Sequence, residues 1–498
     1  MKLRVDWRAS LSLVGTILKW LSVPLLIPLG IAVYYGEDLV PFFVTIIVTL
    51  VVGFGLEFLR KKEQRELGSR EAFLMVSLVW FAIALVGAVP FVLADKGVLG
   101  QPVNALFESM SGITTTGATV IGDFGVHSRS VLMWRQVIQW IGGLGILVFA
   151  ISILSQLSVA GAQLMETETQ GIKKLTPRIV ETARLLGKIY LLLTALQVVV
   201  LYTLHIAGLA PNMTLYNAVA HAFTTIATSG FSPEARSIEA FSPIVQWVIV
   251  PFMAVGATNF ILLYYVLNGD LRRPFRSEEF RFYIAVLVSL SVIVAVLLFL
   301  DPGYTGNLEK TLRHSFFQVV SIVTTTGYAN TDFNLWSSFA KHILFLGMFI
   351  GGMAGSTTCS IKTLRWLVVF KGFRRDLFRM IHPEVIRPLR LSGEVVDEET
   401  IRDIYSYTLL SIIIFFLTTI FIVVDAARIG LDITEFEAMG AAASTFLNIG
   451  PAFGIAGPFG SYDAFANTTK IFMVLLMWIG RIEILPILVL LTPAYWRS

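Results

Sequence analysis

The chain alternates between long apolar stretches and short polar ones. Ten stretches are long enough for an apolar helix of roughly 20 residues that crosses a bilayer; they cover 11–35, 39–59, 72–94, 130–158, 184–208, 240–267, 282–300, 338–370, 402–425 and 468–494. At about 1.5 Å per residue, four shorter amphiphilic segments reach only halfway across a membrane; they lie near 104–116, 214–229, 311–326 and 435–449. The pattern predicts an all-α, polytopic membrane protein.

Composition supports the membrane prediction and excludes several kinds of site. Only 14% of the 498 residues are charged and the mean hydropathy is +0.75, whereas soluble proteins carry about 25% charged residues. The net charge of +4 gives no reason to expect nucleic acid as a partner. One cysteine, Cys359, excludes an internal disulfide and a cysteine-rich metal site. The histidines lack metal-ligand spacing and no catalytic constellation is visible, so we expect neither an enzyme nor a bound cofactor.

Lysine and arginine gather in loops on one side of the predicted spans. They follow an even number of crossings, on the side of an N-terminus that carries Lys2, Arg4 and Arg8, which predicts that this side and both termini are cytoplasmic. The four short segments then all fall on the outer side. The four basic loops hold Arg60, Lys61, Lys62, Arg65 and Arg70; Lys173, Lys174, Arg178 and Arg184; Arg272, Arg273, Arg276 and Arg281; and Lys371, Arg374, Arg375, Arg379, Arg387 and Arg390.

A glycine motif occurs four times, at intervals of roughly 100 residues. The glycines are Gly117, Gly230, Gly327 and Gly450, and six positions before them stand Ser111, Thr224, Ser321 and Ser444. Each interval holds a spanning helix, a short segment, a glycine loop and another spanning helix, which indicates internal duplication. We expect two N-terminal helices in 1–70 and repeats in 71–160, 161–270, 271–390 and 391–498. Because each repeat crosses twice, all four share one orientation and can surround an axis along the membrane normal.

These loops are suited to binding a dehydrated cation. Irregular backbone at membrane depth is tolerated where it lines a water-filled path, and glycine permits positive φ and close backbone approach. The short helices would direct their partially negative C-termini at the centre. Four such loops make a ring of carbonyl oxygens that can replace the hydration shell of a monovalent cation. Glycine turns that merely close helical hairpins would explain one copy, but not four with matched hydroxyls.

The motifs "TTTGAT", "ATSGFS", "TTTGYA" and "NIGPAFG" resemble those of the Trk/Ktr/HKT superfamily of potassium transporters, in its bacterial TrkH-type branch. The resemblance covers essentially the whole chain. It implies four M1–P–M2 repeats around one central pseudo-fourfold pore, two extra helices before them, and a homodimer. It assigns the K⁺ selectivity filter to Thr115, Thr116, Gly117, Thr228, Ser229, Gly230, Thr325, Thr326, Gly327, Asn448, Ile449 and Gly450. The fourth set departs from threonine–glycine, so its side chains cannot brace the loop as the others do.

The second helix of the third repeat contains "GGMAGSTTCS", residues 351–360. Its glycines and hydroxyls would break a membrane helix near its middle, and freed backbone groups there need protein or water partners. The resemblance implies a mobile intramembrane gate made by Gly351, Gly352, Gly355, Ser356, Thr357 and Thr358. A packing kink is the alternative, because glycines also recur at Gly142, Gly143, Gly145 and Gly256.

Arg481 is the other anomaly, since a cation at membrane depth costs about 2.5–3.5 kcal/mol on insertion scales. It must therefore face a partner or water, and Glu483, two residues on, points elsewhere on a helix. The resemblance implies an arginine in the pore that helps shut the loop. An arginine that binds buried carbonyls as scaffold is the alternative.

Four acidic residues follow the glycine loops: Asp123, Glu234, Asp332 and Asp463. They could concentrate cations at the outer mouth, or they could be ordinary solvated loop residues. The pattern alone does not separate these two possibilities.

We expect a K⁺ uptake subunit of the bacterial inner membrane that passes K⁺, and Rb⁺, inward down the electrochemical gradient. A symporter that couples K⁺ to H⁺ or Na⁺ on the same scaffold is the alternative, and a membrane enzyme is disfavoured by the absence of clustered acidic or histidine residues at one depth. The resemblance also implies a separate cytosolic TrkA-type subunit that binds NAD or ATP and controls the gate. The basic loops alone indicate only a positively charged docking surface.

Overall fold

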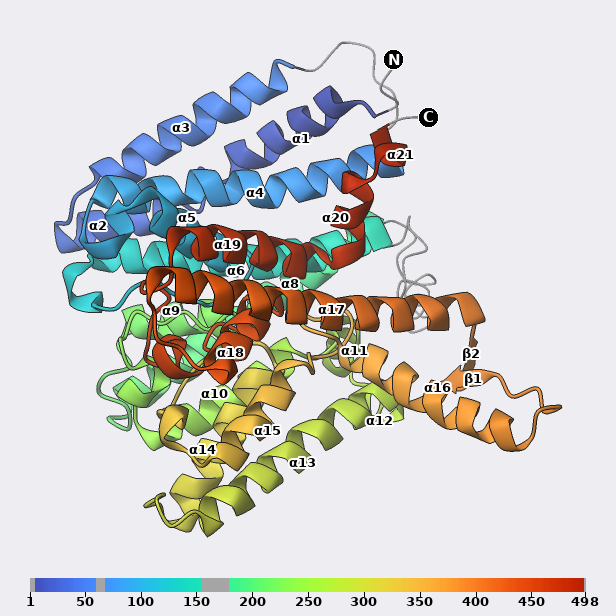
Figure 1. Cartoon of the computed structure of the whole chain (residues 1–498). Helices are drawn as coiled ribbons and strands as arrows, with labels where there is room; N and C mark the ends of the chain where they lie inside the picture. The colour runs from blue at the N-terminus through green and yellow to red at the C-terminus, as the bar shows by residue number, and fades with distance from the viewer. Residues whose placement is uncertain (1–4, 60–67, 155–178, 497–498) are drawn as a thin grey trace.

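The computed structural model describes residues 5–59, 68–154 and 179–496, which are almost entirely helical (Figure 1). Before the first repeat stand α1 (Trp7–Trp20), α2 (Leu26–Tyr35) and α3 (Val40–Glu57). The next two groups are α4 (Ser69–Ala94), α5 (Pro102–Ile113) and α6 (Arg129–Leu154), then α8 (Ile179–Ile206), α9 (Leu215–Ile226), α10 (Pro243–Gly256) and α11 (Phe260–Leu267).

The second half of the chain repeats this order. After α12 (Arg273–Arg276) come α13 (Glu278–Leu300), α14 (Leu308–Val323), α15 (Ser338–Met348) and α16 (Thr363–Ile381), and finally α17 (Glu398–Ile429), α18 (Glu435–Phe446), α19 (Asn467–Ile482), α20 (Ile484–Leu491) and α21 (Pro493–Trp496). Between α16 and α17, β1 (Leu389–Leu391) and β2 (Glu394–Val396) form an antiparallel hairpin. Short 3₁₀ turns are η1 (Gly97–Gly100), η2 (Phe124–Val126), η3 (Ser237–Ala240), η4 (Phe333–Leu335) and η5 (Gly454–Ala456).

Some of the sequence predictions fall outside the described residues. These are the basic residues Lys2, Arg4, Arg60, Lys61, Lys62, Arg65, Lys173, Lys174 and Arg178, and the boundary between the first two predicted repeats at 160/161.

Long apolar helices form the outside of the protein. Five described helical segments are long and apolar enough to cross a membrane: Val40–Glu57, Arg70–Ala94, Glu181–Ile206, Glu278–Leu300 and Glu398–Ile429. Only 28–50% of their most apolar windows is buried, so their remaining apolar surface faces outward. Such a surface suits lipid and not water. The protein is therefore a multi-pass membrane protein.

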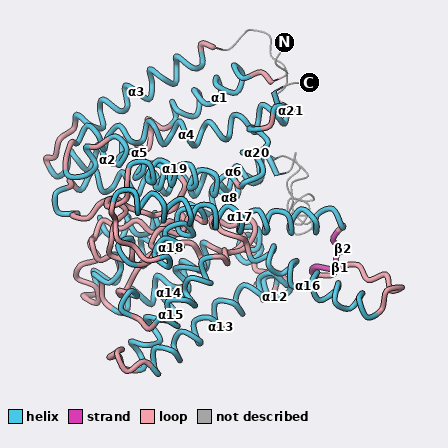
Figure 2. Tube along the Cα trace, viewed as in Figure 1, coloured by secondary structure: helices cyan, strands magenta, loops and turns pink. Residues whose placement is uncertain are grey.

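Most loops lie at one end of the long helices, and the basic end of α16 lies at the other (Figures 1 and 2). Most loop segments gather around α9 and α18, while the β1–β2 hairpin and the end of α16 project from the other end (Figures 1 and 2). The C-terminal helix α21 meets α4 and the segment before α1, where Tyr495 packs with Leu74 and Val5. The Tyr495 hydroxyl also donates to the carbonyl of Arg70 in α4.

Three stretches that we predicted as continuous spanning helices are broken in the structure. The stretch 11–35 divides at a turn containing Pro24, which has no N–H to donate. The stretch 240–267 bends by 106° between α10 and α11, where the side chain of Asn259 caps α11 by accepting from the amide of Ile261 at 2.8 Å. The stretch 468–494 breaks at Glu483, whose φ is +70°.

Three of the four short helices are capped by a side chain at one end, and all four end close to a glycine. Thr214, Asn307 and Thr434 each accept a hydrogen bond from a first-turn amide of α9, α14 and α18, which satisfies donors that a helix start leaves free. Every short helix ends four residues before its glycine: α5 at Ile113, α9 at Ile226, α14 at Val323 and α18 at Phe446.

The inner helices carry a glycine where they cross the ends of the short helices. A Cβ on Gly142 would collide with the carbonyl oxygen of Ile113, and one on Gly480 with that of Phe446. A Cβ on Gly256 would lie 3.2 Å from the carbonyl oxygen of Ile226. These glycines permit backbone to approach backbone, which explains why glycine recurs both in α6, which continues past Gly142, and in α10, which ends at Gly256.

This packing predicts that Gly142→Ala destabilises the protein by about 1–3 kcal/mol, the usual cost of an extra methyl group in a filled site. The matched control is Gly145→Ala on the same helix, because the atoms nearest its added Cβ are 3.6 Å away on the Trp80 ring. The control should be neutral or slightly stabilising. Thermal unfolding of both variants in detergent measures the difference, and equal midpoints would contradict the packing argument.

Candidate functional site

The four glycine loops have the same backbone. The residue two positions before each glycine has positive φ, at 55° for Thr115, 49° for Thr228, 51° for Thr325 and 56° for Asn448. The glycines follow at 82°, 73°, 78° and 106°. In each loop the amide before the glycine donates, at 2.9 Å, to the carbonyl five residues earlier; the pairs are Thr116–Ser111, Ser229–Thr224, Thr326–Ser321 and Ile449–Ser444.

Three of the four left-handed residues are threonines, which is unusual. A β-branched side chain disfavours positive φ, and such strain costs about 1–3 kcal/mol per residue where the surroundings enforce it. Asn448 adopts the same conformation more easily. Strain of this kind concentrates at ligand-binding positions, so the repeated conformation marks these loops as a candidate site.

The loops meet in a closed ring. At each glycine, the position that a Cβ would occupy lies against a backbone carbonyl oxygen of the next repeat. That carbonyl belongs to the residue immediately before the next repeat's glycine. The pairs are Gly117 with Ser229, Gly230 with Thr326, Gly327 with Ile449, and Gly450 with Thr116. The last pair closes the circle from the fourth repeat to the first, and no side chain fits at any of the four positions.

A cavity of about 200 Å³ lies over this ring. All four glycines line it, together with Thr119, Arg135, Phe231, Glu234 and Tyr462 among others. Residues far apart in the sequence thus form one chamber with backbone carbonyls beside it.

In two of the repeats, the serine six positions before the glycine donates a hydrogen bond to a backbone carbonyl of its own loop. Ser321 Oγ donates to the carbonyl of Tyr328 at 2.7 Å and Ser444 Oγ to that of Gly450 at 2.6 Å. The Gly450 carbonyl also accepts from Tyr462 at 2.9 Å, so it already has two donors within the protein.

A buried ion pair that we did not predict holds the first two loops. Glu108 of α5 accepts from Arg135 Nε at 2.7 Å and from the amide of Val120 at 2.9 Å. Arg135, on α6, also donates to the carbonyl of Ser232 in the second loop at 3.1 Å. Both side chains are at most 1% exposed. The available signal was a glutamate and an arginine in stretches otherwise suited to the membrane, where charges need partners.

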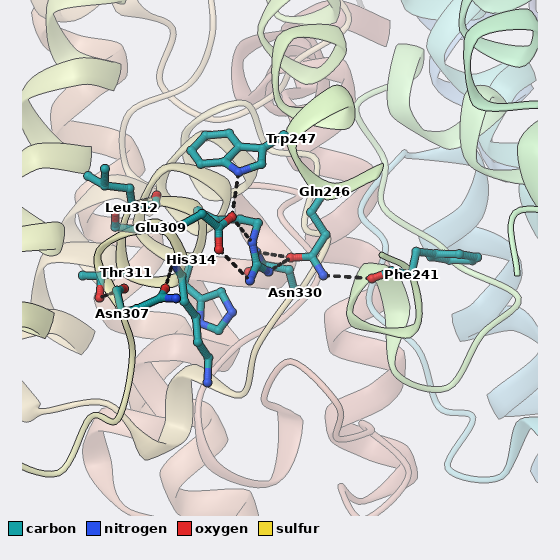
Figure 3. A network of polar contacts seen from close by, with 12 residues as sticks. Phe241, Gln246, Trp247, Asn307, Glu309, Thr311, Leu312, His314 and Asn330 are labelled. Carbon is teal, nitrogen blue, oxygen red and sulfur yellow. Dashed lines mark hydrogen bonds and ion pairs between the residues drawn. The ribbon is translucent and has the colours of Figure 1, made fainter. Parts of the chain in front are cut away.

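A second network holds the third loop in the same way (Figure 3). Asn330 accepts from Gln318 of α14 at 2.9 Å and donates to Gln246 of α10 at 3.0 Å. Arg313, paired with Glu309 at 2.8 Å, also donates to Gln246. Gln246 belongs to the second repeat and Asn330 to the third, so the inner helix of one repeat braces the loop of the next.

The inner helix of the first repeat braces the second loop through a further side chain, and the inner helix of the fourth repeat contacts the short helix of the first. Gln139 of α6 donates to the Ser229 carbonyl at 2.7 Å and accepts from the amide of Phe231 at 3.0 Å. Lys470 of α19 donates to Asn104 of α5 at 2.7 Å, which links the fourth repeat to the first.

The predicted interruption of the third repeat lies against the ring. The backbone is non-helical from the end of α15 at Met348 to the start of α16 at Thr363, and we name residues 349–362 the intramembrane loop. Thr357 Oγ1 is 3.0 Å from Thr228 Oγ1 and donates to the carbonyl of Ile226 at 3.1 Å. The amide of Cys359 donates to Thr325 Oγ1 at 3.2 Å.

The intramembrane loop also pairs with the break between α10 and α11. The amide of Met353 donates to the carbonyl of Ala257 at 2.9 Å, and the carbonyl of Gly355 accepts from the amide of Phe260 at 3.1 Å. Gly355 has a φ of +76°, and a Cβ on Gly352 would lie 2.7 Å from the Ala257 carbonyl oxygen.

Further hydrogen bonds, from side chains and from the backbone, hold the rest of the intramembrane loop in place. Ser356 Oγ donates to the carbonyl of Met353 at 2.6 Å and lies 2.7 Å from Thr358 Oγ1. The backbone of Gly351 donates to Ile361 at 2.9 Å. Glu279 of α13 accepts from the amide of Ala354 at 2.7 Å.

Arg481 joins three repeats and is 2% exposed. Its guanidinium donates at 2.9 Å to the carbonyl of Thr357 in the intramembrane loop, to Cys359 Sγ and to the carbonyl of Gly142 in α6. Glu483 is not its partner, and instead pairs with Arg365 at the start of α16 at 2.8 Å. Among the described residues no carboxylate lies within ion-pair distance of Arg481. The predicted contact with loop carbonyls is therefore present, and its contact with the first repeat is new.

Comparisons with known proteins agree with this architecture. A family model described as "TrkH: Cation transport protein" matches residues 39–498. The chain is 34% identical over 500 residues to the Trk system potassium uptake protein TrkH of Escherichia coli K12, covering 99% of this chain and 100% of that protein. It is 32% identical over 489 residues to TrkG of the same organism, with 97% of each chain covered.

The crystal structure of the potassium transporter TrkH from Vibrio parahaemolyticus matches with a TM-score of 0.87 and 32% identity, over 99% of this chain and 100% of that one. The resemblance seen in the sequence motifs is thereby confirmed. The family match, the relatives and the common fold show that this chain belongs to the TrkH family of cation transport proteins.

Proposed function

We propose that this protein is the membrane subunit of a potassium uptake system of the bacterial inner membrane. K⁺ passes inward down its electrochemical gradient through the ring of four glycine loops, and both termini are cytoplasmic. The observation that carries the proposal is the closed ring of glycine–carbonyl contacts under a cavity that all four glycines line. Its relatives are named potassium uptake proteins.

Backbone carbonyls in a ring can replace the water around a monovalent cation. The filter residues are Thr115, Thr116, Gly117, Thr228, Ser229, Gly230, Thr325, Thr326, Gly327, Asn448, Ile449 and Gly450. The strained left-handed residues fix the direction of the loop backbone, and the cross-repeat braces hold the second and third loops in place. Such a ring distinguishes K⁺ and Rb⁺ from smaller cations by its spacing and by the field of its carbonyl dipoles.

The intramembrane loop is the gate in this proposal. It lies directly against Thr228 and Thr325, and Arg481 ties it to α6. A fixed positive charge beside the path repels a cation more strongly in low dielectric than in water. Helix α16 continues from the loop to the basic segment at 371–390, so a cytosolic TrkA-type nucleotide-binding subunit docked there could displace the loop. The subunits pair as a homodimer.

Ion flux into liposomes containing the purified protein tests the main proposal. Uptake should be faster for K⁺ and Rb⁺ than for Na⁺ and Li⁺. Reversal potentials should follow the K⁺ gradient alone, whereas a shift with pH or with Na⁺ would instead support the coupled symporter. Equal uptake of all four cations would overturn the filter assignment.

A side chain at the first ring glycine should damage selectivity. A Cβ on Gly117 meets the Ser229 carbonyl, and its φ of +82° disfavours any L side chain. Gly117→Ser should therefore reduce discrimination between K⁺ and Na⁺ about tenfold, equivalent to about 1.4 kcal/mol. Gly122→Ala is the control, because Gly122 lines the same cavity but has room for a side chain. The atom nearest to its added Cβ would be Ser461 Oγ, at 3.9 Å. Permeability ratios from bi-ionic potentials measure both; an unchanged ratio in folded Gly117→Ser would count against the ring as the filter.

Removing the Arg481 charge should open the pore. Hydrogen bonds from a charged group contribute about 1.5–3 kcal/mol each, so losing them should favour the open state by about tenfold or more. K⁺ flux without a cytosolic partner should rise in Arg481→Ala, and rise less in Arg481→Lys, which keeps the charge but not the planar fork.

The control for this pair is Arg428→Ala, whose side chain is 57% exposed and pairs with Asp425. Its flux should match that of the parent. If Arg481→Ala folds and dimerises but conducts no more than the parent, Arg481 is scaffold and not part of a gate.

A further inference from the structure

The four acidic residues that follow the glycine loops differ in their surroundings. Asp123 and Asp332 accept hydrogen bonds from amides two residues on, at 2.9 and 3.0 Å, and so cap turns in their own loops. Asp463 accepts from Asn104 at 3.0 Å and lies 3.6 Å from Lys470 Nζ. Glu234 alone of the four lines the cavity over the ring.

Glu234 is held in place by neutral groups. Its Oε1 accepts from Asn217 Nδ2 at 3.0 Å, and its amide donates to Ser232 Oγ at 3.0 Å. Within the described part of the chain no lysine, arginine or histidine lies within ion-pair distance of its carboxylate. The side chain is thus oriented without being neutralised.

The positive charges that line the same cavity are already paired. Arg135 is bonded to Glu108 at 2.7 Å, and Arg236 to Glu239 at 2.5 Å. Among the described lining residues, Glu234 therefore supplies the uncompensated charge of the chamber. It also lines a larger outer groove of about 1040 Å³ between α2, α6 and α9, so it stands where that groove adjoins the cavity over the ring.

We infer that Glu234 is the residue that collects cations for the ring. A single carboxylate in a partly enclosed chamber raises the local concentration of monovalent cations, and K⁺ can lie near it with its water before it meets the carbonyls. The inference rests on the proposed function, because it assumes that the ring is the entry to the pore. It gives Glu234 a role in apparent affinity and entry rate, and none in distinguishing K⁺ from Na⁺.

The test is Glu234→Gln in the full-length protein in liposomes, with initial Rb⁺ uptake measured against external Rb⁺ concentration. KM should rise about two- to tenfold with little change in maximal rate. This is less than the roughly 10- to 1,000-fold by which a whole charged cleft alters association, because only one carboxylate is removed. The Rb⁺/Na⁺ preference should stay as in the parent. Glu234→Asp, which keeps the charge, should restore most of the loss.

Ionic strength separates an electrostatic role from a structural one. Raising the ionic strength with impermeant N-methylglucamine chloride should increase the KM of the parent, because exposed charges are screened. The difference in KM between the parent and Glu234→Gln should therefore become smaller. Asp332→Asn is the matched control and should behave as the parent. An unchanged KM in folded Glu234→Gln, a difference insensitive to ionic strength, or an equal effect of Asp332→Asn would overturn the inference. A parent protein that takes up no Rb⁺ would instead overturn the proposed function itself.

Discussion

Every backbone N–H and C=O at membrane depth needs a partner within the protein or in pore water, and the interior of this protein contains much non-helical backbone. The intramembrane loop and the break between α10 and α11 meet this requirement by bonding to each other, through Met353 with Ala257 and Gly355 with Phe260. Arg481 supplies donors for the carbonyls of Thr357 and Gly142. A broken helix in one repeat is therefore stabilised by a broken helix or a side chain in another, and the repeats cannot be understood one at a time.

The same dependence appears in the ring and around it. Each glycine touches the carbonyl before the next glycine, while inner-helix side chains such as Arg135 and Gln246 brace the loop of the following repeat. Because each loop contacts the next around the ring, the position of one loop depends on that of its neighbour. The glycines of the inner helices bring these helices close enough to the short helices for the braces to reach.

Much of this arrangement was predictable from local patterns. The short amphiphilic segments, the glycine motif and the interruption near Gly351 are visible because a few consecutive residues depart from their apolar surroundings. The breaks near Asn259 and at Glu483 were missed, since hydropathy averages over a window and stays high across a single turn. The partners of Glu108 and Gln246 could not be assigned, because they depend on which repeats are neighbours. Arg481 shows both cases. Its burial cost predicted that it faces a partner or water, and the resemblance placed it beside the loop, whereas its bond to Gly142 of the first repeat required the folded chain.

The position after the inner-helix glycine shows what joining four repeats in one chain makes possible. It is occupied by Gly143 in the first repeat, Ala257 in the second and Arg481 in the fourth, while in the third Gly352 follows the first glycine of the intramembrane loop. Of these four residues only Arg481 carries a charge. Four identical subunits around an axis would have to place four guanidinium groups there, whose mutual repulsion in low dielectric would be severe. A fused chain can change the residue in one repeat without changing the other three repeats. Covalent linkage thus allows an approximately fourfold arrangement to contain a single, asymmetric contact, the one that Arg481 makes with the intramembrane loop and α6.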